Sequence, residues 1–407
     1  MIMWRGVVSL DATGRNSIVR SLFFSALLYS LGCSEDPSLL NSLSTKFTEA
    51  DILIVSDTLH ATTTTSFRKN LPMNGIVNLA GSDGNHEAIM ALQFTQSQFP
   101  QRDTVNVISA ELKLRAVTWY GNDAGTLNLT AHKILRGWNP FTIIWDSLDV
   151  TLNPGFYEES VVRGTYSGMM SSDTEYVTIP LDTALVREWL RPSNFTQYGI
   201  VLVPAPGSTL VRGFTALGAD SLQFQPKLTV IAKNFAGTVQ DTAEYGLGTD
   251  TFAGNVDSVV TATDRMFTQA GVVYRSKIVF DPSSIPQGAI INKADIILTL
   301  DPTSSQIGKF SADTLVSLHV LTTSVQDGPF ELAGFLATAY SSSSVSFEAR
   351  HAVQLWVNGI NNGVLLRASS LNEFTTFDLH VFYGPTAADP TVRPRVQVLY
   401  TTEKGAK

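Results

Sequence analysis

Apolar and polar residues alternate along much of the chain, which is the spacing of a strand with one buried face. Leu112 and Leu114, for example, are separated and flanked by charged residues. Short runs of this kind are divided by turn-forming clusters such as Gly81–Asn85 and Gly121–Gly125. Turn clusters between short strands are typical of antiparallel sandwiches. The pattern therefore predicts an all-β protein built from antiparallel sheets.

One segment departs from this alternation and has helical spacing. Between Asp182 and Leu190 the apolar residues fall on one helical face, with Asp182 available as the N-cap and Pro192 as a stop. A second segment, Phe347 to Val357, repeats this spacing. A single short helix that bridges two strands of a β-domain is consistent with a jelly roll.

The same order of motifs occurs twice along the chain. The strand that ends at Phe94 returns in the second half with Phe280 at its end. The terminal strand that begins at Pro226 returns at Pro394. The offset between the copies is smaller for the second pair than for the first, so the second copy has lost part of its middle.

We expect two homologous jelly-roll-like β-sandwiches in tandem, at residues 48–233 and 236–403, each with one short helix. Each copy opens with an extended, Thr-rich stretch, near Asp57 in the first and near Asp250 in the second. Residues 234–237 form the link between the copies. Because this link is short and neither Pro-rich nor Gly/Ser-rich, we expect the two domains to be held close together.

The amino-terminal segment has the features of an export signal. Leu22–Leu31 is an apolar run that follows two arginines and is too short to span a bilayer as a helix. It is followed by Cys33, the only cysteine of the chain. The arrangement resembles a bacterial lipoprotein signal, in which the thiol receives the lipid.

This resemblance implies a signal peptide at residues 1–32, lipid attachment at Cys33 and a tether over residues 33–47. We therefore expect an exported protein at the outer membrane or cell surface that contacts the membrane only through its lipid. In the alternative interpretation, Cys33 is a small apolar filler and Leu22–Leu31 is a core helix. In either case a single cysteine cannot form a disulfide within the chain, so each domain depends on its own core.

The order of motifs resembles the DNRLRE domain family of β-sandwich modules, which occur in secreted and surface proteins. The matching motifs of the first copy are Ala110–Leu114, Trp138 with Trp145, Trp189-Leu190, Gly199–Leu202 and Pro226–Val230. The second copy has no equivalents of Trp138 and Trp145. The resemblance implies a surface module, and some members of the family bind polysaccharides whereas others have no known ligand.

The charge balance argues against a nucleic-acid partner. The chain has 28 Lys and Arg residues against 36 Asp and Glu residues, a net charge of −8, and no basic cluster stands out. Binding to nucleic acid relies on a basic patch that attracts phosphates. We therefore expect no nucleic-acid partner.

No motif in the sequence indicates an enzyme. The six histidines do not occur at metal-binding spacing, and there is no nucleophile elbow, phosphate-binding loop or dinucleotide-binding glycine pattern. The adjacent carboxylates Glu158 and Glu159 would point to opposite faces of a strand, whereas the two acids of a glycosidase face one bond. We expect no catalytic residues.

Aromatic residues beside polar turns are the candidate ligand-binding groups, because sugars stack their apolar faces on such rings. Trp119 and Tyr120 precede a polar turn that contains Asn122. Tyr157 and Arg163 lie in a loop that the second copy lacks. We take these five residues as the predicted site, with core packing as the open alternative for Trp119 and Tyr120. For Trp138 and Trp145 we favour core packing.

Gly81–Asn85, or Asp146 together with Asp149, supplies oxygen atoms of the kind that bind a structural calcium ion. Neither spacing is that of an EF-hand loop, so we predict no metal site and no cofactor. The prediction is an exported surface lipoprotein with a non-catalytic role in polysaccharide binding or adhesion. The alternative is a structural or assembly subunit of the cell surface with protein partners and no sugar ligand.

Overall fold

Strands account for 54% and helical residues for 8% of the computed structural model, which confirms the expected all-β fold class. The structure describes residues 52–95, 105–190, 197–219, 222–234, 240–257, 260, 262–309, 316–324, 330–336, 343–370 and 372–404. The predicted signal peptide, the tether and Cys33 lie outside the described residues. Residues 54–401 form one compact unit.

We call the domain formed by the first sheet the first sandwich. The strand order of this sheet is β11-β10-β4-β9-β2-β3-β8-β5-β6, with β7 paired to β4. Because β11 pairs with both β10 and β3, six of its strands close into a ring. Its strands are β2 (Val77–Ser82), β3 (His86–Phe94), β4 (Val105–Gly121), β5 (Thr126–Lys133), β6 (Gly164–Met169), β7 (Glu175–Pro180), β8 (Ile200–Pro204), β9 (Leu210–Thr215), β10 (Lys227–Asn234) and β11 (Gln240–Val256).

The second sheet, the second sandwich, has the order β16-β15-β18-β13-β1-β20-β14-β17, with β12 paired to β13 and β19. Strands that are equivalent in the sequence repeat have equivalent neighbours in the two sheets. In this correspondence β13 matches β3 and β20 matches β10. Its strands are β1 (Ile52–Arg68), β12 (Arg265–Gln269), β13 (Tyr274–Phe280), β14 (Ile290–Thr299), β15 (Val316–Leu321), β16 (Phe330–Leu336), β17 (Ser344–Glu348), β18 (Val364–Ala368), β19 (Leu379–Tyr383) and β20 (Arg395–Glu403).

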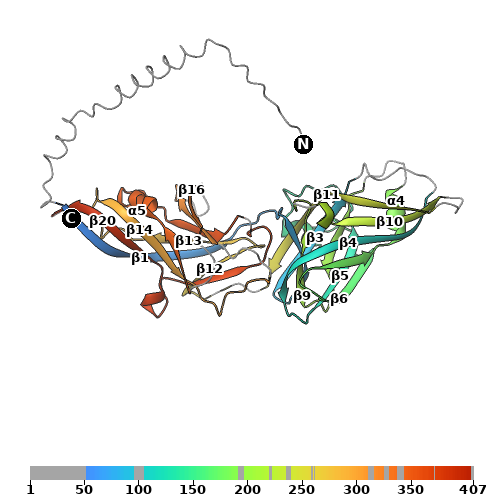
Figure 1. Ribbon diagram of the computed structural model, residues 1–407, viewed down its shortest axis with the longest axis horizontal. Coiled ribbons are helices and arrows are strands. Elements are labelled where there is room, and N and C mark those ends of the chain that lie inside the picture. Colours follow the sequence, from blue (N-terminus) through green and yellow to red (C-terminus); the bar gives the residue numbers. More distant parts are fainter. Residues whose placement is uncertain are drawn as a thin grey trace, which may run out of the picture. The chain divides into compact units, whose positions relative to one another are not determined.

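The opening strands of the two copies are exchanged between the sandwiches. β1, drawn in blue in Figure 1, lies among the orange and red strands of the second copy, between β13 and β20. β11 instead lies between β3 and β10 of the first copy. Ala61 lies opposite Phe280 in the second sandwich, and Leu247 lies opposite Phe94 in the first. Ala61 and Leu247 are separated by the same offset as Phe94 and Phe280, so β1 and β11 fill equivalent positions in opposite sandwiches.

A hairpin explains why β11 stays with the first sandwich. β10 ends at Asn234 and β11 begins at Gln240, and Lys233 lies opposite Gln240 in an antiparallel ladder. A connection of this length between antiparallel strands is typical of a hairpin. The expected boundaries at 233 and 236 therefore follow the sequence repeat but not the strand pairing, because the short link joins two strands of one sheet.

The predicted helices are present, with one change of boundary. α4 (Thr183–Trp189) is capped by Asp182, whose carboxylate accepts a hydrogen bond from the Ala184 amide at 2.9 Å. Its counterpart α5 (Arg350–Val357) begins later than the expected Phe347, which is the fourth residue of β17 and is buried. Phe347 belongs to the strand because its partner in the ladder is Ile296 of β14. The first copy has one additional turn of helix, α3 (Trp145–Leu148).

The exchange also appears in the hydrophobic cores. Leu59 of β1 is packed in the core of the second sandwich and is 2% exposed. Tyr245 of β11, the equivalent residue of the second copy, is packed in the core of the first and is 3% exposed. Each core is therefore completed by a side chain that the sequence repeat assigns to the other copy.

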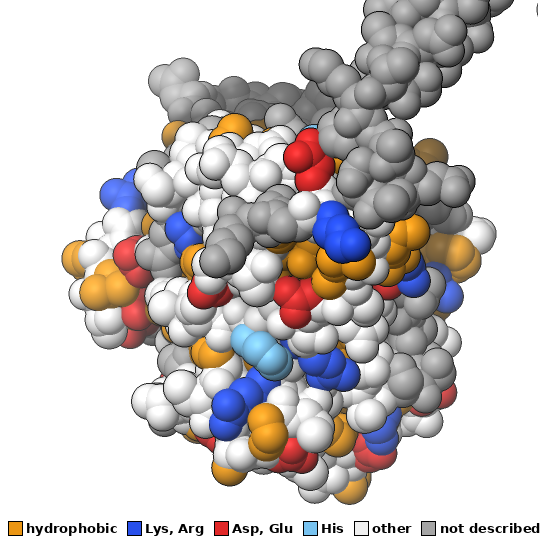
Figure 2. All heavy atoms as spheres, turned by 90° about the vertical axis from the view of Figure 1, so that its left-hand side faces the viewer, with side chains coloured by type: hydrophobic (Ala, Val, Ile, Leu, Met, Phe, Trp, Pro, Cys, Tyr) orange, Lys and Arg blue, Asp and Glu red, His pale blue; other side chains and the backbone are white. Residues whose placement is uncertain are grey.

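The surface carries charges of both signs. In the view of Figure 2, the Lys and Arg side chains are interspersed with Asp and Glu side chains. This face therefore lacks the single-sign field that attracts phosphate groups. In the part of the chain that the structure describes, no helix has the length and apolar character required to cross a membrane.

Candidate functional site

The three aromatic rings of the predicted ligand site are buried. Trp119 is 3% exposed, Tyr120 2% and Tyr157 5%. A ring must present a free face to stack on a sugar, and these rings present none. The interpretation of Trp119, Tyr120 and Tyr157 as a stacking platform is therefore corrected to core packing, the alternative left open for the first two.

The two polar residues of the predicted site have local structural partners. The side chain of Asn122 is exposed and accepts a hydrogen bond from the Ala124 amide at 3.0 Å, which shapes the turn after β4. Arg163 forms ion pairs with Glu158 at 2.7 Å and Asp182 at 2.8 Å. Arg163 thereby joins the loop before β6 to the cap of α4, and it lies with neither Trp119 nor Tyr120 in one site.

Trp138 and Trp145 pack as expected. Both are partly buried against a small core that contains Tyr157. The indole N–H of Trp138 donates to the carbonyl of Tyr198 at 2.9 Å. These rings therefore support the fold of the first sandwich.

Trp119 and Tyr120 stand at a junction between the two sandwiches, the feature that we take as the candidate functional site. The Lys309 amide donates to the Trp119 carbonyl at 3.2 Å, and Thr118 donates to the Lys309 carbonyl at 2.6 Å. The Trp119 indole N–H donates to Asp123 at 3.1 Å, and the Lys309 ammonium pairs with the same carboxylate. The end of β4 is thus held to a segment of the second copy by backbone and side-chain contacts.

Tyr120 contributes a buried hydrogen bond to the same junction. Its hydroxyl donates to the Asp378 carboxylate at 3.0 Å, which also accepts the Gly308 amide at 2.8 Å. Burial, together with the nearby Asp378 charge, raises the pKa of Tyr120 well above its usual value. A Cβ at Gly308 would stand 2.3 Å from the Tyr120 ring, so only glycine permits this approach. The phenol is therefore a fixed neutral donor and not an acid.

Phe377 is a residue of the second copy whose side chain packs in the core of the first sandwich. It is fully buried in that core and packs against the rings of His86, Tyr120 and Phe252. His86 stacks on Phe377 with the ring centroids 5.0 Å apart. Its two ring nitrogens contact Asp83 at 2.9 Å and Gln269 at 3.0 Å. Residues of β3, β4 and β11 therefore converge on the Phe377 ring, and Gln269 of β12 is linked to it through His86.

A buried ion pair positions the loop that carries Phe377. Arg275 of β13 binds Glu373 through two hydrogen bonds of 2.9 and 3.0 Å, and Arg367 contacts the same carboxylate. Arg275 is 4% exposed and Glu373 is 0% exposed. The bidentate geometry fixes the direction of the loop as well as its position. Two positive groups around one buried carboxylate thus anchor residues 372–378 to the second sandwich.

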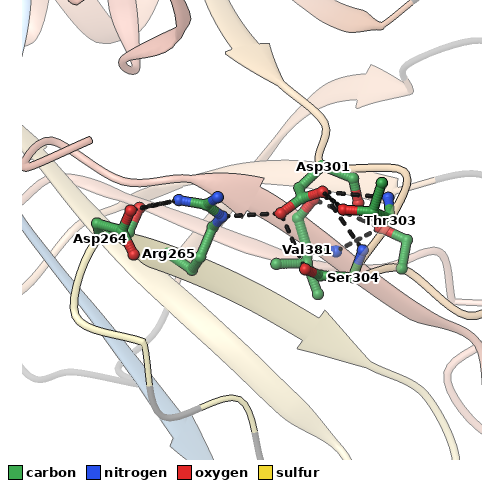
Figure 3. A network of polar contacts seen from close by, with 7 residues as sticks. Asp264, Arg265, Asp301, Thr303, Ser304 and Val381 are labelled. Atoms are coloured by element: carbon green, nitrogen blue, oxygen red, sulfur yellow. Dashed lines mark hydrogen bonds and ion pairs between the residues drawn. The ribbon is translucent and has the colours of Figure 1, made fainter. Parts of the chain in front are cut away.

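A second polar network, shown in Figure 3, joins three segments within the second sandwich. Asp301 accepts hydrogen bonds from Thr303, from Ser304 and, at 2.9 Å, from the Arg265 guanidinium. Although burial raises the pKa of Asp301, the hydrogen bonds from Thr303 and Arg265 outweigh it and hold the pKa well below the usual range. Arg265 also pairs with Asp264. The network links β12 to residues 301–304, the segment that follows β14 along the chain.

The candidate calcium ligands are used in turns. Asp83 accepts the backbone N–H groups of Asn85 at 2.9 Å and His86 at 2.7 Å. Asp149 accepts both the amide and the hydroxyl of Thr151. In the described ranges there is no group of three or more His, Cys, Asp or Glu residues that could hold a metal ion.

One shallow trough lies on the second sandwich, away from the predicted site residues. Its volume is about 380 Å³, and it is formed across β1, β14 and β20. The lining is mostly polar, and Leu399 supplies an exposed apolar side chain. Lys293 and Asp295 form an ion pair of 2.9 Å along its edge. Its lining residues are Ser56, Asp57, Thr58, Lys293, Asp295, Gln397, Val398 and Leu399.

Sequence reasoning found the β4 side of the junction but missed its other side. Phe377, Asp378 and Lys309 follow no motif of the repeat, and Asp378 is far from Tyr120 along the chain. The polar neighbours of Phe377 gave no signal that it would be buried in the other copy.

The searches of protein families and of curated proteins identify no relative of this chain. No known protein family matches it, and a search of curated proteins finds no similar protein. The likeness to the DNRLRE domain family therefore stays a prediction from the spaced motifs.

Proposed function

We propose that this protein is a non-catalytic structural subunit of the cell surface that meets protein partners as one rigid unit. In this proposal it is exported and is held to the membrane only by a lipid at Cys33. The observation that carries the proposal is the reciprocal exchange of β1 and β11 between the sandwiches.

The exchange supports a structural role because neither sandwich is complete without a strand that the repeat assigns to the other. The chain passes between the sandwiches twice, after β1 and after β11. Tandem domains joined by a single linker move relative to each other unless their interface is large. Two crossings and the packing of Phe377 in the first core oppose such motion. A rigid unit of this kind suits a spacer or building block.

The burial of the candidate rings favours the same proposal over sugar binding. Trp119, Tyr120 and Tyr157 are the residues whose exposure would have favoured a glycan site, and all three are at most 5% exposed. Trp119 and Tyr120 instead stabilise the junction through Asp123 and Asp378. Packing therefore accounts for the three candidate rings of the first copy.

A glycan array and a lipid-labelling experiment together test this proposal. We expect the chain from Ser34 to Lys407, made without lipid, to retain no polysaccharide on the array. In a bacterial host, we expect a clickable fatty acid to label the full chain, and Cys33→Ser to abolish the label. Polysaccharide retention would contradict the structural role, and labelling that survives Cys33→Ser would contradict the anchor.

Polysaccharide binding is the second candidate function, and the trough on the second sandwich is the observation that favours it. Its volume of about 380 Å³ is near the lower end of ligand sites, roughly 300–1,000 Å³. The carboxylate of Asp57 and the amide of Gln397 are suited to sugar hydroxyls, and Leu399 offers an apolar contact. β1 supplies Asp57, so the exchange is needed to complete the trough.

The same array separates the two candidates by a matched pair of variants. If the trough binds sugar, Gln397→Ala abolishes retention, whereas Thr229→Ala leaves it unchanged. Thr229 of β10 is the matched control because it follows Pro226 at the same spacing as Gln397 follows Pro394. Equal retention by both variants would place any sugar site elsewhere.

A further inference from the structure

We propose that copies of this chain associate by exchanging β1, so that β1 of one copy pairs between β13 and β20 of another. The partner is therefore a second copy of the same chain. This inference rests on the assembly role proposed above and supplies the contact through which assembly occurs.

The contacts of β1 make it a separable element. Its ladder with β13 runs from Ala61 opposite Phe280 to Arg68 opposite Tyr274, and its other neighbour is β20. Leu59 is the one residue of the strand that is fully buried, and Val55 and Ala61 are partly buried against the same core. Both neighbouring strands belong to the second sandwich, although the chain continues from β1 into the first. A strand placed in this way can be supplied by another copy without loss of any ladder contact.

β11 fills the equivalent position in the first sandwich but cannot be supplied in the same way. Lys233 and Gln240 pair at the end of the hairpin, so β11 is tied to β10 by a short connection. β1 has no such restraint, because its covalent neighbour, the segment 69–76, leads into the other sandwich. Exchange between copies is therefore specific to β1.

The segment between β1 and β2 has the character of an exchange hinge. It covers positions 69–76, with a reach of roughly 26 Å when extended. Pro72 fixes its own φ and disfavours a helical conformation at Leu71, which keeps these two residues extended. It is held at Lys69, whose amide donates to Val273 at 2.9 Å, and at Met73, which bridges to Phe252. Exchange of an identical element between copies takes place at connecting segments of this kind, which are short and join the element to the rest of the chain.

The balance between the two arrangements depends on concentration. The ladder contacts of β1 are the same within one chain and between two chains, so association is opposed mainly by the loss of free motion. Attachment of many copies to one membrane through Cys33 would reduce that cost by raising their effective concentration. Two copies that exchange strands reciprocally form a closed pair, and exchange in one direction forms an open chain of copies.

Two single-cysteine variants test the exchange, both in the full chain with Cys33→Ser. One carries Thr65→Cys and the other Lys277→Cys, because residues 65 and 277 lie opposite each other in the β1–β13 ladder. A disulfide between these two variants must join two copies. The matched control mixes Glu87→Cys with Asn255→Cys, which lie opposite each other in the β3–β11 ladder.

The variants of each pair are unfolded together, refolded at increasing concentration, oxidised and analysed on a non-reducing gel and by peptide mass spectrometry. We expect a covalent dimer linked through residues 65 and 277 that increases with concentration, and no linked dimer in the control. Failure to detect the 65–277 linkage at any concentration would overturn strand exchange between copies. That failure would leave the structural role itself intact, because the glycan array and the lipid label test it independently.

Discussion

Leu59→Ala is the substitution that most clearly separates the exchanged arrangement from two independent tandem domains. Leu59 lies in the first copy of the sequence repeat, but its side chain packs in the core of the second sandwich. Truncation of a buried leucine to alanine costs about 2–5 kcal/mol, because apolar contacts are lost and a cavity remains. A change of about 1.4 kcal/mol is tenfold in an equilibrium constant. The equilibrium constant for opening of the second sandwich should therefore rise by a factor between about 30 and about 4,000.

Hydrogen exchange resolved by peptide mass spectrometry measures this effect strand by strand. In Leu59→Ala we expect protection to fall more in β13, β18 and β20 than in β3 and β8. The reciprocal variant Tyr245→Ala should show the reverse order, because Tyr245 packs in the first core. The reasoning would be refuted if Leu59→Ala mainly loosened β3 and β8 while β13 and β20 kept their protection.

Three further substitutions have defined outcomes. Burial raises the pKa of Asp250 to about 6, so between pH 4 and 6 the folded state retains a proton that the unfolded state releases. Denaturant titrations should show the free energy of unfolding falling by about 2 kcal/mol between pH 4 and 6 in the wild type, and no such fall in Asp250→Asn. Tyr120→Phe removes one hydrogen bond to the buried Asp378, and urea titration should show a loss of about 1–3 kcal/mol. Asp301→Ala removes the acceptor of Arg265 and should lower the melting temperature at pH 7. Because the pKa of Asp301 is depressed, the difference between Asp301→Ala and wild type should begin to shrink as pH falls below about 4 and should continue to shrink toward the lower pKa of the folded state.

Much of the fold is predictable because it depends on local spacing. Alternation around Leu112 and Leu114 predicts a strand, and both residues are buried in β4. Asp182 predicts the start of α4 because its short carboxylate can cap the first turn. The repeat of Phe94 at Phe280 predicts equivalent strands, and β3 and β13 have equivalent partners in the two sheets.

The strand exchange is not predictable from the repeat, because equivalent strands suit equivalent positions in either sandwich. Only the length of the connection from Asn234 to Gln240 distinguishes the arrangements, since it suits a hairpin within one sheet. The position of Trp119 and Tyr120 is hidden for a related reason. A polar turn follows them in the sequence, but the residues that cover them lie far away along the chain, as Asp378 shows.

A methyl–methyl nuclear Overhauser measurement tests the exchanged arrangement most directly, in a deuterated chain labelled at Ile, Leu and Thr methyl groups. Thr64 lies opposite Ile278 in the β1–β13 ladder, and side chains opposite each other in a ladder lie about 5 Å apart. If β1 paired within its own copy, Thr64 would take the place of Asp250, opposite Leu92. We predict a cross peak between Thr64 and Ile278. A cross peak between Thr64 and Leu92 in its place would contradict the account.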